Sequence, residues 1–378
     1  MIAALRRAGL AILALIAVTF WLLPLVEAIS LLAILSLIPI LPLAIGRLDT
    51  RFKRAVSPVL QFRYVGALLI ALGIALPFFS DLFTLRLYSE LLILGLLTMS
   101  LDVMMGYVGL ASFAHAALSG LAAYTVAIVL NRFDLGIWIA IGAGIFAGTA
   151  ITTVMGAFSV RVRDIYFGII TLVFGNVFFI IANTWVSVTN GEDGLTIALP
   201  VLTIPGLFAI DTGDLTQFWY LTLGVVSISF IVLRAFLRSP IGLVFQGIRE
   251  NEERTRYLGY NVNHFKILST AVSGFFASIA GILLLFKNAI IGTEQLFMIF
   301  SGEIVIWAVI GGLGTLVGPF VGAAFVHLVA DFLTEFTERH LLIIGLVFIV
   351  TILLVPRGII GAISEAWRSD NKNEETKS

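Results

Sequence analysis

We predict an all-α polytopic membrane protein with about 12 transmembrane segments, some of them broken or re-entrant. The first observation is composition: 60% of the 378 residues are hydrophobic and only 12% are charged, whereas about a quarter of a soluble chain is charged. The second is that apolar blocks recur from end to end, each near the roughly 20 residues that cross a bilayer. An ordinary soluble domain is therefore excluded.

The candidate spans follow these apolar blocks in chain order. They cover residues 8–26, 28–45, 64–80, 91–107, 110–130, 136–158, 165–186, 217–235, 267–286, 301–312, 316–333 and 341–355. The first block ends at Leu22-Leu23-Pro24, which has no small-residue cleavage site. We therefore expect it to be retained in the membrane rather than removed as a signal peptide.

Basic residues predict the orientation of these spans, because connections rich in Lys and Arg stay in the cytoplasm. One set of connections holds nineteen of the 23 basic residues, including those around positions 47–63, 161–163 and 234–266 and in the C-terminal tail. The other set keeps only Arg86, Arg132, Lys287 and Arg339. Both termini are therefore expected in the cytoplasm, which requires an even number of spans.

Two glycine-rich segments are expected to interrupt spans. The first is Gly106-Tyr107-Val108-Gly109-Leu110, and the second runs from Gly311-Gly312-Leu313-Gly314-Thr315 to Gly318-Pro319. Backbone left unpaired in lipid costs several kcal/mol per group, so such a break must be buried in protein or face a cavity. Gly314, Gly318 and Gly322 also form a small-xxx-small row, which predicts close helix packing.

The longest basic connection is the loop 234–266. Ser239 with Pro240 is typical of a helix start, and Gly259 is typical of a helix stop. The apolar side of this short helix would be formed by Leu243, Phe245, Ile248 and Leu258. A helix of this length is marginal alone in water. It either rests on the membrane beside its own spans or docks into a groove on a cytoplasmic partner.

Several chemistries are excluded by missing residues. The chain has no cysteine and no net formal charge, which excludes a disulfide scaffold, a cysteine nucleophile and a basic nucleic-acid surface. It also lacks a Gly-Lys-Ser/Thr phosphate loop and a Gly-x-Ser-x-Gly elbow. The four histidines are too dispersed for a metal site. We expect no enzyme activity, no cofactor and no metal in this chain.

Motifs that occur in order over residues 85–362 resemble the branched-chain amino-acid ABC transporter permeases of the LivM type. They are Glu90-Leu91, Gly106-Tyr107-Val108-Gly109, Ser112-Phe113-Ala114-His115-Ala116-Ala117, Gly120-Leu121-Ala122-Ala123-Tyr124, Arg163-Asp164-Ile165-Tyr166-Phe167-Gly168, Thr189-Asn190-Gly191-Glu192-Asp193-Gly194, Ser239-Pro240-Ile241-Gly242, Ile248-Arg249-Glu250-Asn251-Glu252, Leu258-Gly259-Tyr260, Ser301-Gly302-Glu303, Gly311-Gly312-Leu313-Gly314-Thr315-Leu316 and Pro356-Arg357-Gly358-Ile359-Ile360-Gly361.

The resemblance implies a domain layout. Residues 1–63 form an N-terminal two-span extension outside the resemblance, and its role is not assigned. Residues 64–362 form the permease core with the coupling loop 234–266, and residues 363–378 form a polar cytoplasmic tail. The location implied is the bacterial inner membrane.

The resemblance also implies partners. Two permease chains, identical or homologous, would pair across a central path, and a soluble binding protein would deliver substrate to the outer face. Two ATP-binding subunits would receive the 240–260 loop, so any ATP is bound by another chain. Contact with them is expected to involve Phe245, Ile248, Arg249, Glu250, Asn251, Glu252 and Gly259. The acidic loop 187–216, which has no Lys or Arg, is a plausible contact for the binding protein.

Polar residues inside the spans are candidates for the path, because an ionisable group there costs at least about 2.5 kcal/mol. Asp102 either lines a polar cavity or accepts hydrogen bonds from neighbouring helices near a break. The family usually has Asn at this position, which argues against a shared task for Asp102. Glu303 either borders the path or sits at the start of a short helix, where the macrodipole stabilises a carboxylate.

Two further sets of polar residues have two interpretations each. Ser112, His115 and Ser119 are spaced for one helix face, and Asn176 and Asn183 repeat this pattern on another helix. Such residues either hold transmembrane helices together or border the substrate path. The candidate path residues are therefore Asp102, Ser112, His115, Asn176 and Glu303.

The predicted function is a permease subunit of an ABC importer for branched-chain or related small amino acids. One alternative is a permease of the same family for urea or short amides, because the binding protein largely selects the substrate. A second is a self-sufficient secondary transporter, which would need coupling residues beyond Asp102 and Glu303 and would leave the loop 234–266 unexplained. A third, a membrane scaffold without transport, does not predict two broken helices.

Overall fold

The computed structural model describes residues 70–71, 73–79, 81–133, 135–162, 165–204 and 208–334, with positions 345, 349 and 358–361 nearer the C-terminus. The predicted spans 8–26 and 28–45, most of 64–80 and nearly all of 341–355 lie outside the described residues. The domain limits at 63 and 362 lie outside them too. The predicted count of about 12 spans is therefore not confirmed.

The described chain is predominantly helical. Its main helices are α5 (Leu82–Asp102), α6 (His115–Phe133), α7 (Ile137–Ser159), α8 (Ile165–Thr184), α10 (Leu215–Leu237), α13 (Val262–Asn288), α14 (Met298–Gly311) and α15 (Val317–Thr334). Short helical elements are η1 (Leu76–Phe78), η2 (Val103–Val108), α9 (Val186–Thr189), η3 (Gly191–Asp193), α11 (Pro240–Glu250), α12 (Glu252–Tyr257) and η4 (Thr293–Leu296). Each of the eight spans predicted between 91 and 333 corresponds to one main helix.

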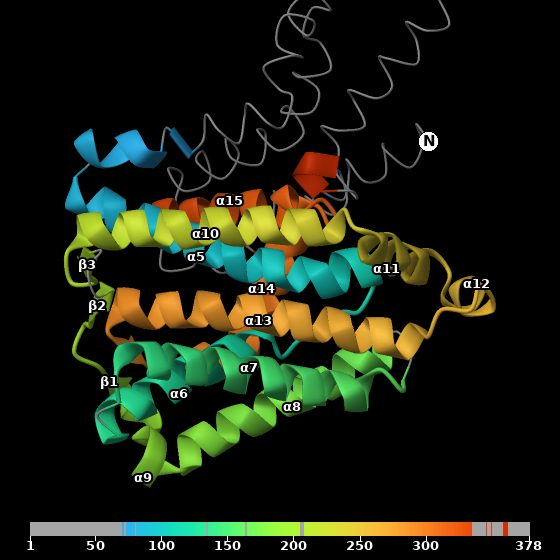
Figure 1. The fold of residues 1–378 in the computed structure, drawn as a ribbon, viewed down its shortest axis with the longest axis horizontal. Coiled ribbons are helices and arrows are strands. Elements are labelled where there is room, and N and C mark those ends of the chain that lie inside the picture. Colours follow the sequence, from blue (N-terminus) through green and yellow to red (C-terminus); the bar gives the residue numbers. More distant parts are fainter. Residues whose placement is uncertain are drawn as a thin grey trace, which may run out of the picture.

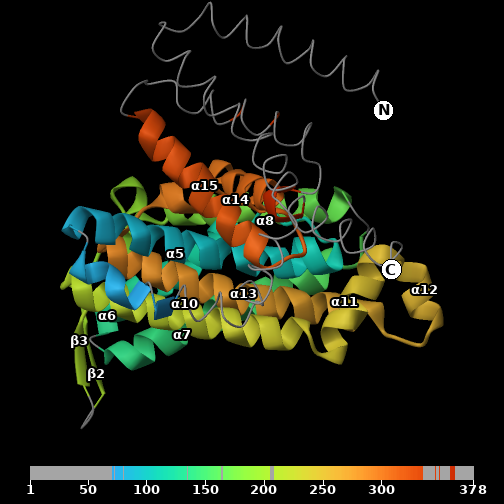
Figure 2. The same ribbon diagram turned by 90° about the horizontal axis from the view of Figure 1, so that it is seen from above.

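Among the described residues, six helices are long and apolar enough to cross a membrane, and α14 and α15 are shorter. The predicted 91–107 span begins earlier than expected: α5 runs continuously into η2, so this helix covers Leu82–Val108. The main helices run roughly alongside one another (Figure 1), and α15 crosses the bundle obliquely (Figure 2). An all-α polytopic membrane protein is the architecture that this bundle forms.

Helix α5 is the centre of the bundle. Of its most apolar window, 89% is buried inside the protein, against 22% for α7. Helices α10, α13, α14 and α15 all contact it. A helix that is apolar all round is expected to be buried on all sides, and α5 meets this expectation. Large apolar side chains on α7, α8 and α10 instead face outward from the bundle; examples are Phe146, Val173 and Ile228.

Small residues set the close packing of α7 on α13. A Cβ added at Gly274 of α13 would lie 2.5 Å from the Thr152 side chain of α7. Gly148 and Gly156 of α7 are similarly crowded by Ser278 and Thr270 of α13. Membrane helices have no hydrophobic drive to associate in lipid, so small residues that let backbones approach are what hold them together.

The two ends of the bundle differ. Helices α11 and α12 lie at one end, called here the loop end, and β1, β2 and β3 lie at the other, called the strand end (Figure 1). Strand β1 (Leu195–Thr196) pairs antiparallel with β4 (Ile290–Ile291), with Leu195 opposite Ile291. Strand β2 (Val201–Ile204) pairs antiparallel with β3 (Phe208–Asp211), with Val201 opposite Asp211.

Both predicted glycine breaks are present. Helix α5 ends in the π-helical turn η2, after which Gly109 takes a left-handed conformation (φ 86°) and the chain runs without helix to His115. Helix α14 ends at Gly311, followed by Gly312 (φ 114°) and Gly314 (φ 79°). Only glycine adopts such angles without strain. The row of small residues also packs as predicted, since Gly318 and Gly322 lie against the backbone of α14.

Candidate functional site

The loop predicted as one short helix forms two. Helix α11 begins directly after Ser239, at Pro240, as expected, but it ends at Glu250 because Asn251 is extended (φ −161°, ψ 102°). The Asn251 side chain then caps α12, since its Oδ1 accepts a hydrogen bond from the Arg254 amide at 2.8 Å. Asn is among the best N-cap residues, so the interruption at position 251 is encoded locally. The single helix predicted from Ser239 to Gly259 is therefore wrong.

The apolar side of α11 packs against its own bundle. Phe245 is fully buried and Ile248 nearly so. The Phe245 ring meets Phe236 of α10 and Phe265 of α13 edge-on, with centroids 5.9 and 6.5 Å away. Two of the side chains expected to contact a partner thus hold the loop on the bundle, and their contact with a partner stays a prediction.

An ion-pair cluster fixes the direction of α12. Glu252 accepts hydrogen bonds from Arg256 on its own helix at 2.9 Å and from Lys266 of α13 at 2.7 Å. The Lys266 side chain is only 4% exposed. A partly buried pair of this kind orients the loop, because separating it would leave a desolvated ammonium without its partner.

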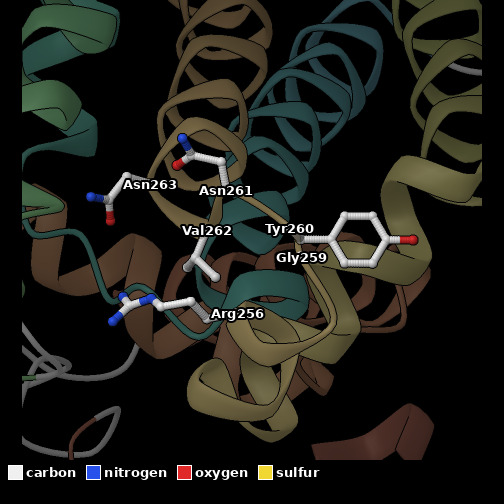
Figure 3. A pocket seen from close by; sticks show the side chains of 6 residues that line it. All are labelled: Arg256, Gly259, Tyr260, Asn261, Val262 and Asn263. Carbon is white, nitrogen blue, oxygen red and sulfur yellow. The ribbon is translucent and has the colours of Figure 1, made fainter.

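The surface of the loop that faces away from the bundle is partly apolar. Leu243, Tyr257 and Leu258 are 66%, 88% and 72% exposed. Beside them is an open hollow of about 410 Å³, lined by Arg256, Gly259, Tyr260, Asn261, Val262 and Asn263. Figure 3 shows the Tyr260 ring pointing away from the Asn261 and Asn263 amides. These exposed apolar side chains at the loop end are available to a partner.

The remaining loop residues singled out from the sequence are exposed, and Arg249 also donates a hydrogen bond to the Gly106 carbonyl oxygen of the bundle. Arg249, Glu250 and Asn251 are exposed. Gly259 has a left-handed conformation (φ 91°), and none of the described residues lies within 4 Å of where its Cβ would be. Contact of these residues with a partner stays a prediction.

Asp102 joins the two glycine breaks. It is fully buried at the end of α5. Its Oδ1 accepts a hydrogen bond from the Gly314 amide at 2.7 Å, and its Oδ2 accepts one from the Leu316 amide at 3.1 Å. Of the two interpretations of Asp102, this geometry supports the one in which it satisfies backbone groups near a break. The second break thereby avoids unpaired amides inside the bundle.

His115 lies in a buried polar cluster. Its Nε2 is 2.8 Å from Ser100 Oγ of α5 and 3.5 Å from Ser273 Oγ of α13. No described residue pairs with its Nδ1. Ser112 is buried too, but it precedes α6, which begins at His115. The prediction that Ser112 shares a helix face with His115 and Ser119 is therefore wrong, because the chain between Gly109 and His115 is not helical.

The other two candidate path residues lie on separate elements. Asn176 is exposed on α8, as are the nearby side chains of Val173 and Val177. Glu303 is half-buried on α14. The expectation that Glu303 begins its helix is wrong: α14 starts at Met298, and the macrodipole acts mainly within the first turn. The two amides that Asp102 binds belong to Gly314 and Leu316, which lie on neither of the helices that hold Asn176 and Glu303.

An ion-pair cluster near the strand end was missed by the sequence analysis. Glu90 of α5 pairs with Lys287 of α13, and His327 Nε2 of α15 lies 3.8 Å from the Glu90 carboxylate. The missed signal is Glu90 itself, a carboxylate directly before the apolar block 91–107. Lys287 was assigned to a connection, but it belongs to the last turn of α13.

Residues 83–352 match the family described as "Branched-chain amino acid transport system / permease component". The chain is 26% identical over 324 residues to the high-affinity branched-chain amino acid transport system permease protein LivM of Escherichia coli (strain K12), covering 80% of this chain and 76% of that protein. The Salmonella typhimurium protein of the same name is 25% identical, and the match again covers 80% of this chain and 76% of that protein. A probable LivM permease of Methanocaldococcus jannaschii is 25% identical over half of this chain and 63% of its own length. No solved structure matches the chain.

Proposed function

This chain belongs to the family of branched-chain amino acid transport permeases, and we propose that it is the membrane-spanning permease subunit of an ABC importer for branched-chain amino acids. The proposal rests on two observations together, the family match and the shape of the loop end. There, two short helices project from a bundle of membrane helices and expose apolar side chains. A separate ATPase subunit would supply the energy.

The loop end is the proposed cytoplasmic face. Of the described basic residues, Arg161, Arg234, Arg238, Arg249, Arg254, Arg256 and Lys266 belong to this end. Arg86, Arg132 and Lys287 belong to helix turns near the strand end. Since cytoplasmic connections carry the excess of Lys and Arg, we place the loop end, together with both termini, in the cytoplasm of a bacterial cell whose inner membrane holds the chain.

Docking on the ATPase is proposed through the exposed surface of α11 and α12. Leu243, Tyr257 and Leu258 present the apolar anchors that interfaces need, while Phe245 and Ile248 hold the loop on its own bundle. Closure of two ATPase subunits around nucleotide would displace this loop. The displacement would alternate the access of the substrate path, as in other rigid-body transitions.

The substrate path is proposed along a face of α8, between this chain and a second permease. Asn176 exposes an amide there, among apolar side chains that are also exposed. A polar group that faces lipid in a membrane span is unfavourable, and such groups normally face the bundle interior or a water-filled cavity. A second permease, identical or homologous, would cover this face and leave the amide at the path. Ser112, His115, Asp102 and Glu303 remain candidate path residues from other elements.

The strand end is the proposed docking surface for a soluble binding protein. Glu192, Asp193, Asp211 and Asp214 are all exposed there. The loop 187–216 that holds them contains no Lys or Arg. Charge complementarity speeds association, so a binding protein with basic residues around its substrate cleft fits this surface.

Co-purification tests the proposal. The tagged chain, extracted in mild detergent from its own cells, is expected to bring down an ATP-binding subunit and ATPase activity. Changing Tyr257 and Leu258 together to Ser should abolish this co-purification, because it removes the exposed apolar anchors. Leu199→Ser, which removes an exposed apolar side chain at the strand end, is the matched control and should leave it intact. A lone chain that moves substrate on an ion gradient in liposomes would contradict the proposal.

Uptake measurements test the substrate. Vesicles that hold the complex and its binding protein are expected to accumulate labelled leucine, isoleucine or valine when ATP is supplied. Accumulation of urea or a short amide without any of these amino acids would assign the chain to the other substrate class while leaving the importer mechanism in place.

A further inference from the structure

The two glycine breaks meet at one side chain of the loop. Arg249 is in the last turn of α11, and the first break, η2 with Gly109, is adjacent to this helix. The Arg249 guanidinium donates a hydrogen bond from Nη1 to the Gly106 carbonyl oxygen. A Cβ added at Gly109 would lie 3.4 Å from Arg249 Cγ. The arginine side chain therefore lies along the first break.

The same guanidinium also touches the second break. A Cβ added at Gly314 would lie 2.7 Å from Arg249 Nη1 and 3.0 Å from the Gly106 carbonyl oxygen. The backbones of Gly106 and Gly314 are thus in contact, with Arg249 Nη1 beside both. Asp102 also holds this contact, because it accepts a hydrogen bond from the Gly314 amide at 2.7 Å.

Both breaks are places where a helix can change direction. A π-helical turn such as η2 widens the helix and is a recognised site of kinks. Gly109 and Gly314 both have positive φ angles, which only glycine adopts without strain. A small force applied at these points would tilt α5 relative to α6, and α14 relative to α15, more readily than a force applied within a regular helix.

We propose that Arg249 is the positioning residue that transmits movement of the cytoplasmic loop to both helix breaks at once. When α11 is displaced, the Arg249 guanidinium would pull on the Gly106 carbonyl, to which it is hydrogen-bonded. The Gly106–Gly314 contact and Asp102 would then carry the movement to the α14–α15 connection. This inference rests on the proposed function, in which an ATPase subunit moves the loop.

Three variants distinguish a role of Arg249 in transmitting movement from a role in folding and from an effect of its charge. Arg249→Met keeps the length of the side chain and removes its donors. Arg249→Lys keeps a positive charge and an N–H donor at the end of a slightly shorter side chain, although it lacks the planar fork. Arg161→Ala is the matched control, because Arg161 is an exposed arginine at the same end of the bundle, in the turn after α7.

The experiment measures transport and hydrolysis together in proteoliposomes that contain the assembled complex. For Arg249→Met we expect leucine moved per ATP hydrolysed, measured in the complexes that assemble, to be lowered by about tenfold, within the usual range of coupling between sites. Arg249→Lys should recover most of this ratio, and Arg161→Ala should match the unaltered chain.

A second measurement reports changes in the accessibility of the second break. The chain has no cysteine, so Leu313→Cys introduces its only thiol, between Gly312 and Gly314. Labelling of this thiol by a maleimide is expected to change when nucleotide is trapped by vanadate, and Arg249→Met should abolish that change.

The outcomes distinguish the two levels of the proposal. An unaltered chain that binds no ATPase overturns the proposed function and this inference together. If the complex assembles, an unchanged leucine-to-ATP ratio in Arg249→Met overturns the inference alone. Loss of assembly in both Arg249→Met and Arg249→Lys also overturns it, because Arg249 would then serve docking or folding.

Discussion

At the scale of single residues, buried polar groups in this protein satisfy the backbone where helices are interrupted. Asp102 illustrates this, because both of its carboxylate oxygens accept amide hydrogens from the connection between α14 and α15. The partners are 212 and 214 residues away in the sequence. A carboxylate in an apolar block suggests either a transport role or a structural one, and only the position of these amides distinguishes them.

Substitution of Asp102 is expected to destabilise the bundle in a graded way. Asp102→Leu leaves two buried amides without acceptors, at about 1–3 kcal/mol each. Asp102→Asn keeps one acceptor oxygen and should lose about half as much. Thermal unfolding of the detergent-purified chain measures both. Equal losses for Asn and Leu would show that packing, not hydrogen bonding, determines the effect.

Asp214 caps the first turn of α10 at the strand end. Its Oδ1 accepts a hydrogen bond from the Thr216 amide at 2.9 Å. This bond, followed by those from Gln217, lowers the pKa of Asp214 below its ordinary 3.8, because hydrogen bonds to the charged form stabilise it. A lowered carboxylate pKa contributes stability above the unfolded pKa, and this contribution is lost as pH falls through the folded pKa.

The cap should therefore persist throughout the neutral and mildly acidic range. We expect hydrogen-exchange protection of the first turn of α10 to be constant down to about pH 4 and to fall only below it. In Asp214→Ala the protection should be lower at neutral and mildly acidic pH, and the difference from the unaltered chain should shrink below about pH 4. A fall in protection between neutral pH and pH 5 in the unaltered chain would contradict this assignment.

At the scale of elements, small residues determine which helices pack closely. Gly274 of α13 faces Thr152 of α7 so closely that a larger side chain must push the two helices apart. Gly142 of the same α7 is different, since none of the described residues lies within 4 Å of where its Cβ would be. The two glycines therefore provide a matched pair for a packing test.

Gly274→Leu is expected to destabilise the bundle, while Gly142→Leu is not. Overpacking costs typically about 1–3 kcal/mol, and here it would separate α7 from α13. At Gly142 a leucine meets open space and improves helix propensity. The thermal unfolding midpoint of each variant in detergent checks this. Equal midpoints for the two variants would show that the α7–α13 contact is more adaptable than its geometry indicates.

In the loop, local sequence determines where the helices begin, whereas tertiary contacts determine which way their side chains face. Pro240 and Asn251 set where α11 and α12 begin, which is a local effect of helix capping. The inward direction of Phe245 and Ile248 depends on Phe236 and Phe265 from two different membrane helices. The loop sequence alone predicts an apolar helix side, but not whether that side faces the bundle or a partner.

At the scale of the whole molecule, the orientation of the bundle is open to a direct test. Because the chain lacks cysteine, single cysteines at Tyr257 and Leu199 would report the two ends separately. A membrane-impermeant maleimide is expected to label Tyr257→Cys only in inside-out vesicles and Leu199→Cys only in intact spheroplasts. The reverse pattern would invert the orientation and overturn the assignment of the loop end to the cytoplasm.

The sequence by itself determined the membrane-helix architecture, the order of the main helices from α5 to α15, the approximate limits of most of them, both glycine breaks and the start of α11. These features depend on hydropathy, capping and backbone freedom, which are properties of neighbouring residues. Only the tertiary structure decided that α5 is central and that Glu90 pairs with Lys287. It alone also placed Arg249 and Asp102 where the two breaks meet. Those contacts join segments as far as 143 to 214 residues apart, and no local pattern encodes which distant segment will lie alongside.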